Sequence, residues 1–327
     1  MAWEIHHRKG VWLPQIGWWL DAQARAARSF VSHAHSDHIA RHREVLCTAA
    51  TARLLSARLP GKREVTTLPF GRPQALEFGT TATLYPAGHI LGSSQILLEA
   101  ADHGTLLYTG DFKLRPGLAA EPCATPHADV LIMETTFGLP RYVFPPESEV
   151  ITGLIEFCQR TLAEGATPVL LCYSLGKSQE VLRALAPANL PVMLHSDTYR
   201  LTRLCEELGL KFPAYREFSG REAGGHVILC PPHAQGLLSR LPACRTAVIT
   251  GWALDPGAIH RYRCDAAFPL SDHAGFDDLL QFVERVQPKR VLTLHGFARE
   301  FAQTLRSRGW DALAIGQGNQ LEFKLSG

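Results

Sequence analysis

The chain has 327 residues, of which 46% are hydrophobic and 20% are charged, and its formal net charge is +2. This composition supports a sizeable core, argues against intrinsic disorder and indicates a nucleic-acid partner only weakly. Apolar runs stay below the ~18 residues of a membrane span, and the charged start, MAWEIHHRKGVW, lacks the apolar stretch of a signal peptide, so we expect a cytoplasmic protein without a membrane partner.

Eight cysteines are scattered along the chain without a CxxC pair. This spacing favours neither a zinc ribbon nor a disulfide framework. We therefore expect the cysteines to be reduced and mostly buried.

The first 135 or so residues predict short strands separated by turns, with one helix, TAATARLLSARLP, that ends at Pro60. The predicted strands lie in GWWLDA, SFVSH, TATLYPAGH, SQILLEA, TLLYTGD and VLIMETT. These strands end at or near residues that could bind metal or transfer protons, namely Asp21, His33, His89, Asp111 and Glu134. Strand ends at one edge of a sheet are a common place for functional sites in α/β proteins.

From about Pro145 the pattern changes to alternating helices and strands, which predicts parallel βαβ units. From about Phe268 two further elements end near His273 and His295, and a last strand is expected near Leu321. The simplest organisation is an α/β domain interrupted by a second one. We expect an N-terminal part at 1–140, an inserted domain at 141–265 and a C-terminal part at 266–327.

The segment SHAHSDH places three histidines and an aspartate directly after a predicted strand. His33 and His35 are two residues apart, so on an extended backbone both imidazoles point the same way and can reach one ion. Asp37 and His38 follow a turn and point elsewhere, as a neighbouring second ion would require. Imidazoles with a carboxylate are the usual zinc ligands, and paired metals suit phosphoryl chemistry.

The pattern HxHxDH resembles the signature of the metallo-β-lactamase fold, an αββα sandwich with a metal site at one edge. PAGHILGS and YTGDFK resemble two later motifs of that fold, and WWLDA resembles its first. An acidic residue in LIMETTFG and histidines in PLSDHAGF and TLHGF resemble the motifs of the β-CASP nucleases, whose additional domain would be the insertion. TFGLPRYVFPPE, YSLGKSQEVL and SDHAGF are most similar to the short bacterial branch of ligase-associated exonucleases and mRNA 3′-end-processing-like factors.

This resemblance implies two zinc ions, with manganese as the alternative, that share a hydroxide. Their ligands would be His33, His35, His89 and Asp111 for one ion, and Asp37, His38, Asp111 and His295 for the other. Asp21 would orient the metal-binding loop without binding metal. Asp37, Glu134 and His273 are the expected catalytic residues, with His273 donating a proton to the leaving oxygen and Glu134 fixing its tautomer.

Ser174, Lys177 and Ser178 lie in SLGKSQE, before and within a predicted helix. Backbone amides at the start of that helix, together with Lys177, could bind a substrate phosphate. The alternative is a serine N-cap with a solvent-facing lysine.

The expected activity is hydrolysis of phosphodiester bonds in nucleic acid, as a DNA exonuclease in DNA repair with a ligase or helicase as functional partner. His295 complicates this choice, because in longer relatives a histidine at this motif accompanies RNA enzymes. A ribonuclease in RNA 3′-end processing or decay is therefore one alternative. The others are a small-molecule metallohydrolase of the same fold, which would need neither the insertion nor Glu134 and His273, and a non-catalytic scaffold, which should show broken ligands.

Overall fold

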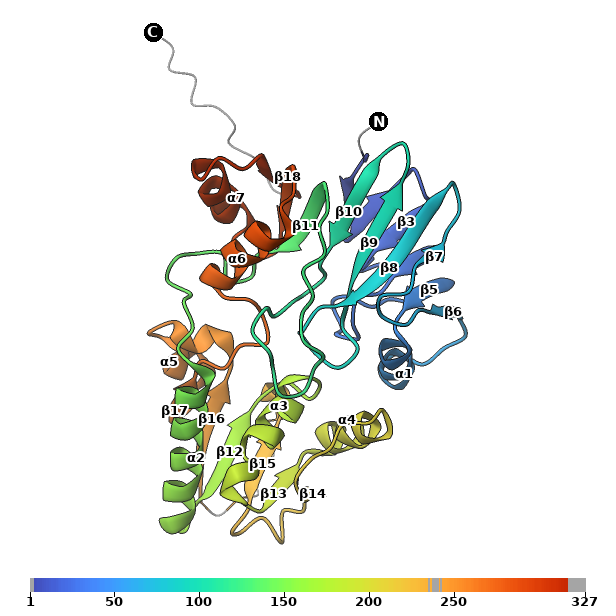
Figure 1. The fold of residues 1–327 in the computed structure, drawn as a ribbon. Coiled ribbons are helices and arrows are strands. Elements are labelled where there is room, and N and C mark those ends of the chain that lie inside the picture. Colours follow the sequence, from blue (N-terminus) through green and yellow to red (C-terminus); the bar gives the residue numbers. More distant parts are fainter. Residues whose placement is uncertain (1–2, 235, 237–240, 242, 317–327) are drawn as a thin grey trace.

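The computed structural model describes residues 3–234, 236, 241 and 243–316, and Figure 1 shows the arrangement of their helices and strands. Two of the three sheets lie in the upper part of that view and the third in the lower part. The strand expected near Leu321 lies outside the described residues. No helix among these ranges is both long and apolar enough to cross a bilayer.

The first sheet contains six strands in chain order, and its last four run parallel. They are β1 (His6–His7), β2 (Val11–Leu13), β3 (Trp18–Leu20), β4 (Arg28–Phe30), β5 (Glu44–Cys47) and β6 (Glu64–Thr67). Helix α1 (Ala49–Arg58) connects β5 to β6. The Thr48 side chain caps its start by accepting a hydrogen bond from the Thr51 amide at 3.1 Å, and the helix ends just before Pro60, as predicted.

The second sheet has seven strands in the order β19-β18-β11-β10-β9-β8-β7. They are β7 (Gln74–Ala75), β8 (Thr80–Pro86), β9 (Ser94–Ala100), β10 (Gly104–Tyr108), β11 (Val130–Glu134), β18 (Arg290–Leu294) and β19 (Ala312–Ala314). Strand β11 joins the two parts of the chain, because it pairs in parallel with β10 on one side and β18 on the other. The last part of the chain therefore returns to complete a sheet that the first part began.

The first two sheets pack face to face and form an αββα sandwich. Their shared core includes Leu20 and Phe30 from one sheet and Leu98 and Tyr108 from the other. On the outer side of the second sheet lie α6 (Phe276–Val286) and α7 (Ala298–Ser307), and on the outer side of the first lies α1. The expected metallo-β-lactamase architecture is confirmed.

The third sheet is the inserted α/β unit, with the order β14-β13-β15-β12-β16-β17 and parallel pairing throughout. Its strands are β12 (Thr167–Leu171), β13 (Val192–Leu194), β14 (Tyr215–Glu217), β15 (Val227–Cys230), β16 (Cys244–Ile249) and β17 (Ala266–Phe268). The helices are α2 (Glu147–Ala163), α3 (Lys177–Ala184), α4 (Ser196–Glu207) and α5 (Ala258–Tyr262), with short 3-10 helices η1 (Ala186–Ala188) and η3 (Gly251–Leu254). This sheet extends to Phe268, three residues beyond the boundary predicted at 265.

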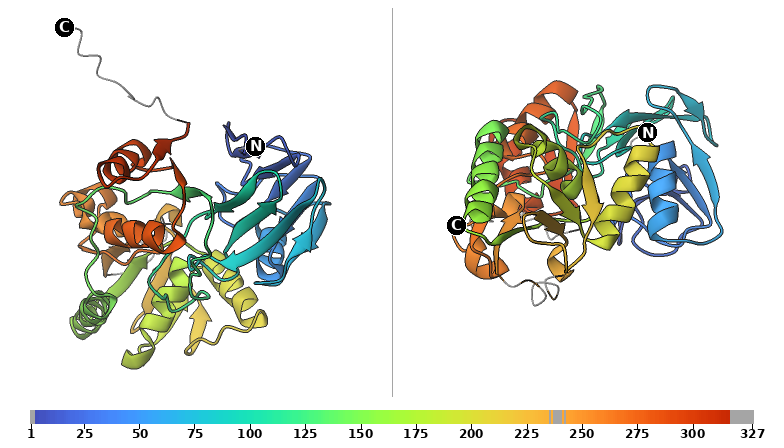
Figure 2. Two further views of the ribbon diagram at one scale, coloured as in Figure 1. Left: turned by 45° about the horizontal axis from the view of Figure 1, so that its top comes forward. Right: turned by 90° about the horizontal axis from the view of Figure 1, so that it is seen from below.

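The insertion contacts the sandwich along α1 and α4, which lie side by side in Figure 2. Arg53 donates a hydrogen bond to Glu207 at 3.0 Å, and Arg200 donates one to the Ala57 carbonyl at 3.2 Å. All eight cysteines are unpaired, and six of them are buried. Burial raises the pKa of the Cys47 thiol to about 12, so it stays protonated, as expected for a structural cysteine.

A buried ion-pair network also connects the two units. Lys113, in the loop after β10, places its Nζ 2.7 Å from Glu147 Oε1 on α2 and 2.7 Å from Glu180 Oε1 on α3. Burial opposes the charged form of Lys113, but Glu180 and Glu147 raise its pKa above the ordinary value. The charge of this lysine thus depends on residues of the inserted unit.

Replacing Lys113 with methionine should lower the free energy of unfolding by about 3 kcal/mol, because the buried Glu180 would lose its 2.7 Å partner and keep only the 3.4 Å contact with Lys177. Urea unfolding followed by circular dichroism measures this loss. The control is Lys289→Met, which breaks the 2.7 Å pair with Asp129 at a lysine side chain that is 83% exposed. That change should cost about 0–1 kcal/mol. Equal losses in the two variants would contradict the role given to Lys113.

Candidate active site

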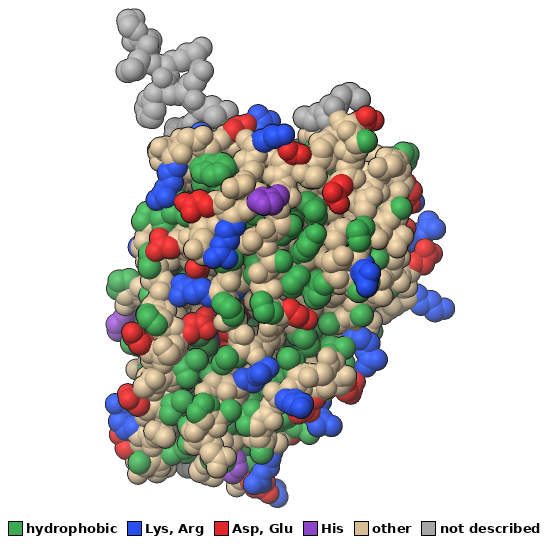
Figure 3. Space-filling view, viewed as in Figure 1, with side chains coloured by type: hydrophobic (Ala, Val, Ile, Leu, Met, Phe, Trp, Pro, Cys, Tyr) green, Lys and Arg blue, Asp and Glu red, His purple; other side chains and the backbone are tan. Residues whose placement is uncertain are grey.

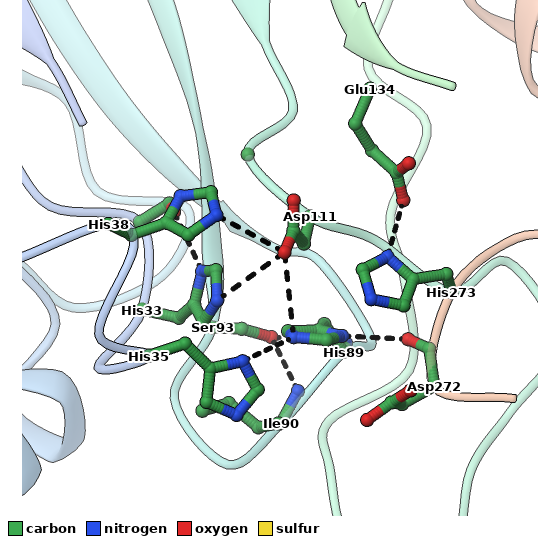
Figure 4. A network of polar contacts seen from close by, with 12 residues as sticks. His33, His35, His38, His89, Ile90, Ser93, Asp111, Glu134, Asp272 and His273 are labelled. Atoms are coloured by element: carbon green, nitrogen blue, oxygen red, sulfur yellow. Dashed lines mark hydrogen bonds and ion pairs between the residues drawn. The ribbon is translucent and has the colours of Figure 1, made fainter. Parts of the chain in front are cut away.

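The predicted metal ligands come together on loops at the ends of β4, β8 and β10 (Figure 4). His33 and His35 follow β4, His89 follows β8 and Asp111 follows β10. Gly110, just before Asp111, has φ +56°, and a Cβ there would lie 2.5 Å from the Cβ of Ser32. Only glycine fits this turn without displacing the loop that carries His33.

Four of these side chains form a compact cluster. The ligand atoms of His33, His35, His89 and Asp111 all lie within 4.8 Å of one another. His35 Nδ1 is 3.0 Å from His89 Nε2, and the buried His33 Nε2 has no hydrogen-bond partner among the described residues. Imidazole nitrogens that converge with a carboxylate, one of them without a hydrogen-bond partner, fit a zinc ion, which prefers these ligands.

One oxygen of Asp111 lies between the two predicted ligand sets. Its Oδ2 is 3.2 Å from His38 Nε2, 3.6 Å from His33 Nε2 and 3.9 Å from His89 Nε2. A carboxylate oxygen in this position could contact cations on both sides.

The second set is more open. Asp37 Oδ2 lies 3.7 Å from His38 Nε2, and the ring of His295 is 6.1 Å from that of His38. In the described part of the chain, no group as compact as the first gathers the ligand atoms of this second set. His295 has a left-handed backbone with φ +60° at the end of β18, and it lines the same cavity as Asp37 and His38. These residues fit a second cation less closely than the first set does.

Asp21 supports the metal-binding loop from beneath. Its carboxylate accepts hydrogen bonds from the Ser32 amide at 2.7 Å, the Ser32 hydroxyl at 2.6 Å and the Tyr108 hydroxyl at 2.9 Å. His38 Nδ1 lies 2.9 Å from the same carboxylate, which leaves Nε2 facing Asp111. Asp21 itself is not part of the compact cluster, so these contacts fix the orientation of the His38 ring.

The protonation of the cluster follows from burial and neighbouring charges. Burial, reinforced by adjacent imidazoles, lowers the pKa of His33 well below its ordinary value and that of His35 to about 3. Burial opposes the charged forms of His38 and Asp111 as well. Their mutual attraction nevertheless raises the pKa of His38 well above its usual range and lowers that of Asp111 well below. His33 and His35 are therefore neutral beside an ionised Asp111, which is the state required for metal binding, whereas His38 would have to lose its proton to bind a cation.

Glu134 and His273 face this cluster from the opposite side (Figure 4). His273 Nδ1 lies 2.9 Å from Glu134 Oε1, and the Thr136 amide donates to Glu134 Oε2 at 2.7 Å. Burial opposes the protonation of His273, but Glu134, followed by Asp111 and Asp272, raises its pKa to about 10. The buried Glu134 therefore holds the histidine ring in one orientation and stabilises its proton.

The predicted phosphate site requires a correction. Lys177 is 1% exposed, and its Nζ lies 3.4 Å from Glu180 Oε2 and 3.4 Å from Asp272 Oδ1. Ser178 is also buried, with its hydroxyl donating to the Tyr173 carbonyl at 2.7 Å. Lys177 and Ser178 therefore stabilise the protein interior and do not face a substrate, whereas Ser174 does line the cavity beside the metal ligands.

That cavity has a volume of about 620 Å³ and is lined by both units. The inserted unit contributes Tyr173, whose surface is 65% exposed, and Trp252. The sandwich contributes Arg58, whose guanidinium donates to the Ala34 carbonyl at 2.6 Å. None of these three residues was predicted as a site residue, although Tyr173 lies in the motif YSLGKSQEVL.

Asp272 was also missed, although it directly precedes His273. Its carbonyl lies 2.7 Å from His89 Nδ1, and its carboxylate pairs with Lys177. Asp272 therefore links a predicted ligand to the inserted unit. The sequence signal was present in SDHAGF, but the partner residues are 183 and 95 positions away.

Comparisons with known proteins agree with this geometry. Residues 263–315 match the family described as "Zn-dependent metallo-hydrolase RNA specificity domain". Over 99% of its length the chain is 60% identical to a "Probable DNA ligase" of Opitutus terrae, of which it spans 32%. It is 28% identical to "5' exonuclease Apollo" of Gallus gallus, over 85% of this chain and 61% of that protein. The chain thus spans less than two thirds of the length of either relative.

A solved structure from Enterococcus faecalis, of a protein of unknown function, has the same fold. It aligns with a TM-score of 0.58 over 89% of this chain and 79% of the other, at 13% sequence identity. The order of the metal-binding motifs, the inserted parallel sheet and these sequence similarities agree with one another. By these features the chain is similar to the β-CASP family of metallo-β-lactamase-fold nucleases.

Proposed function

We propose that the protein is a zinc-dependent nuclease that hydrolyses phosphodiester bonds of nucleic acid. The observation that carries this proposal is the position of Asp111 Oδ2, within 3.9 Å of three imidazoles from two ligand sets. Residues of both units line the cavity beside it, as an extended substrate that contacts both would require. A small-molecule metallohydrolase would not need the Glu134–His273 pair.

In this proposal His33, His35, His89 and Asp111 hold one zinc ion, and Asp37, His38, Asp111 and His295 hold a second. Zinc bound there supplies a Lewis acid that polarises the phosphoryl group and lowers the pKa of water to about 7. The protein's own part is to hold the ligands in place. Asp21 does this for His38 through the 2.9 Å contact with Nδ1.

Glu134 and His273 handle the leaving group. With Nδ1 held by Glu134, the other ring nitrogen of His273 is free to donate a proton to the departing oxygen. Figure 4 shows this nitrogen directed toward the side of the site where His89 lies. Asp37, exposed at the cavity wall, is close enough to His38 to help position the attacking water.

We propose DNA as the substrate and exonucleolytic trimming of ends as the reaction. Similarity to proteins named as a probable DNA ligase and as a 5' exonuclease supports this choice. The trimmed DNA ends would be ready for joining, so a ligase is the proposed partner. RNA is the second candidate, favoured by the match of residues 263–315 to a family described by RNA specificity and by His295 at its motif.

Asp111→Asn should abolish metal binding at both sites and lower cleavage by roughly a hundredfold or more, because the asparagine oxygen lacks the negative charge that would hold both cations. Elemental analysis of the purified protein and an assay with end-labelled oligonucleotide measure the two effects. We expect two zinc equivalents in the unmodified protein. The control is Asp277→Asn, an exposed carboxylate on α6, which should change neither. Retained cleavage in Asp111→Asn would refute the proposed mechanism.

His273→Ala should retain its zinc and lose turnover by about 10²–10⁴-fold, since it removes a proton donor and not a ligand. Glu134→Gln keeps the ring in place and should reduce turnover less. An equal fall of zinc content and activity in His273→Ala would instead make His273 a ligand, an assignment that its closeness to His89 and Asp272 also allows.

A panel of single- and double-stranded DNA and RNA, each with a 5′-phosphate or a 5′-hydroxyl, tests the substrate. We expect single-nucleotide products from DNA ends, resolved on denaturing gels. Faster release from RNA would select the ribonuclease alternative, and internal cuts would contradict exonucleolytic action.

A further inference from the structure

A second cavity, of about 500 Å³, lies beside the candidate active site on the sandwich unit. Its lining is basic: it contains Arg25, Arg41, His42, Arg43, Gly61, Lys62, Arg63 and Glu64. We refer to it as the basic pocket. We propose that the basic pocket binds the phosphate backbone of the nucleic-acid strand as it runs out of the active site.

The charge of the basic pocket is not neutralised by the protein. Five of its lining side chains are cationic and one, Glu64, is anionic. None of the five cations forms an ion pair within 4.0 Å of a carboxylate in the described ranges, whereas other arginines, such as Arg28 and Arg290, are paired. On the face shown in Figure 3, basic and acidic side chains are interspersed. The basic pocket is therefore a local concentration of positive charge in a chain with a net charge of only +2.

Two of these cations are held close together. A Cβ built on Gly61 would lie 3.5 Å from Arg41 Nη1 and 3.9 Å from Arg63 Nη2, so both guanidinium groups approach the same glycine. Burial lowers the pKa of Arg63, and the charge of Arg41 lowers it further. Neighbouring guanidinium groups without a carboxylate between them suit a bound phosphate, which both can contact through paired N–H groups.

The basic pocket also contains unused hydrogen-bond donors. His42 is 2% exposed, and its Nδ1 accepts a hydrogen bond from the Ala26 amide at 3.3 Å, which places the ring proton on Nε2. Within the described ranges His42 Nε2 has no partner, and neither has Arg63 Nη1, although the other terminal nitrogen of Arg63 donates to the Leu59 carbonyl. A buried donor without an acceptor is costly, and a phosphate oxygen would satisfy it.

Three loops connect the basic pocket to the active-site cavity. The loop after β3 places Gln23 in the active-site cavity and Arg25 in the basic pocket. The loop after β4 does the same with His38 and Arg41. The end of α1 contributes Arg58 to the active-site cavity, and the segment after it contributes residues 61–64 to the basic pocket. A nucleic-acid strand that leaves the metal ligands along these loops therefore reaches the basic pocket.

This inference rests on the proposed function, from which it takes nucleic acid as the ligand. It adds the direction in which the nucleic-acid strand leaves the active site. Because a polyanion that spans both cavities binds more tightly than a short one, the effect of the basic pocket should grow with the length of the nucleic acid. A site for a small free anion would not show this dependence.

The test measures binding without cleavage, by fluorescence anisotropy of labelled single-stranded DNA in the Asp111→Asn background. Adding Arg41→Ala and Arg43→Ala, both at exposed positions, should weaken binding by tenfold or more. It should also reduce the slope of log affinity against log salt by about 1.4, or about 0.7 for each lost phosphate contact. Lys62→Glu, a charge reversal at another exposed position, should weaken binding further still.

The matched control adds Arg285→Ala and Arg299→Ala, two exposed arginines on α6 and α7, and should leave the salt slope unchanged. An unchanged slope in the Arg41 and Arg43 variant would overturn the inference. So would an equal loss for a dinucleotide, which is too short to reach both cavities, or competition by inorganic phosphate as strong as that by long DNA. Cleavage by the unmodified protein is measured in a separate assay. A negative result in the binding test is therefore distinguishable from a failure of the proposed nuclease activity.

Discussion

The structure depends on how a buried group of imidazoles is kept neutral beside an ionised carboxylate. Four histidines from two loops surround Asp111, and burial disfavours a charge on any of them. His38 is the exception, because Asp21 and Asp111 lie on opposite sides of its ring. The protein interior therefore presents neutral donors around one anionic oxygen. A buried carboxylate among neutral groups is energetically unfavourable, and a divalent cation stabilises it by supplying the missing positive charge.

The same site requires the sandwich and the insertion to keep a fixed position relative to each other. His89 and His273 come from different parts of the sandwich, and Asp272 connects both to Lys177 of the insertion. Lys113 makes the corresponding link from the other side through Glu180. The two lysines therefore neutralise carboxylates that would otherwise be buried without partners. A small shift of the insertion would alter this network and the position of His273 with it, which is why the ionic contacts matter for geometry as well as for stability.

Much of the fold could be predicted from the sequence, because its long elements have strong local patterns. The strands β9 and β11 occur in SQILLEA and VLIMETT as predicted, and helices and strands alternate after Pro145 as expected for parallel βαβ units. Strand β19 (Ala312–Ala314) was not foreseen, since three small residues become a strand only through pairing with β18. The fully exposed β6 was missed for a related reason, as it is an edge strand with no apolar face. Sequence motifs brought the first ligand set together correctly in space. They placed Lys177 at the substrate, because nothing local to SLGKSQE reveals that Asp272 will lie opposite its ammonium group.

The insertion has a consequence for how the protein is made. Strand β11 pairs with β18, which follows it by more than 150 residues, so the central sheet of the sandwich stays incomplete while the insertion is being synthesised. All the ligands of the first set are already present at that stage, but His273 and His295 are not. A ribosome-bound intermediate could collect metal and still lack the groups proposed to act on the leaving oxygen. The order of the chain thus places the groups proposed to act on the leaving oxygen after the insertion.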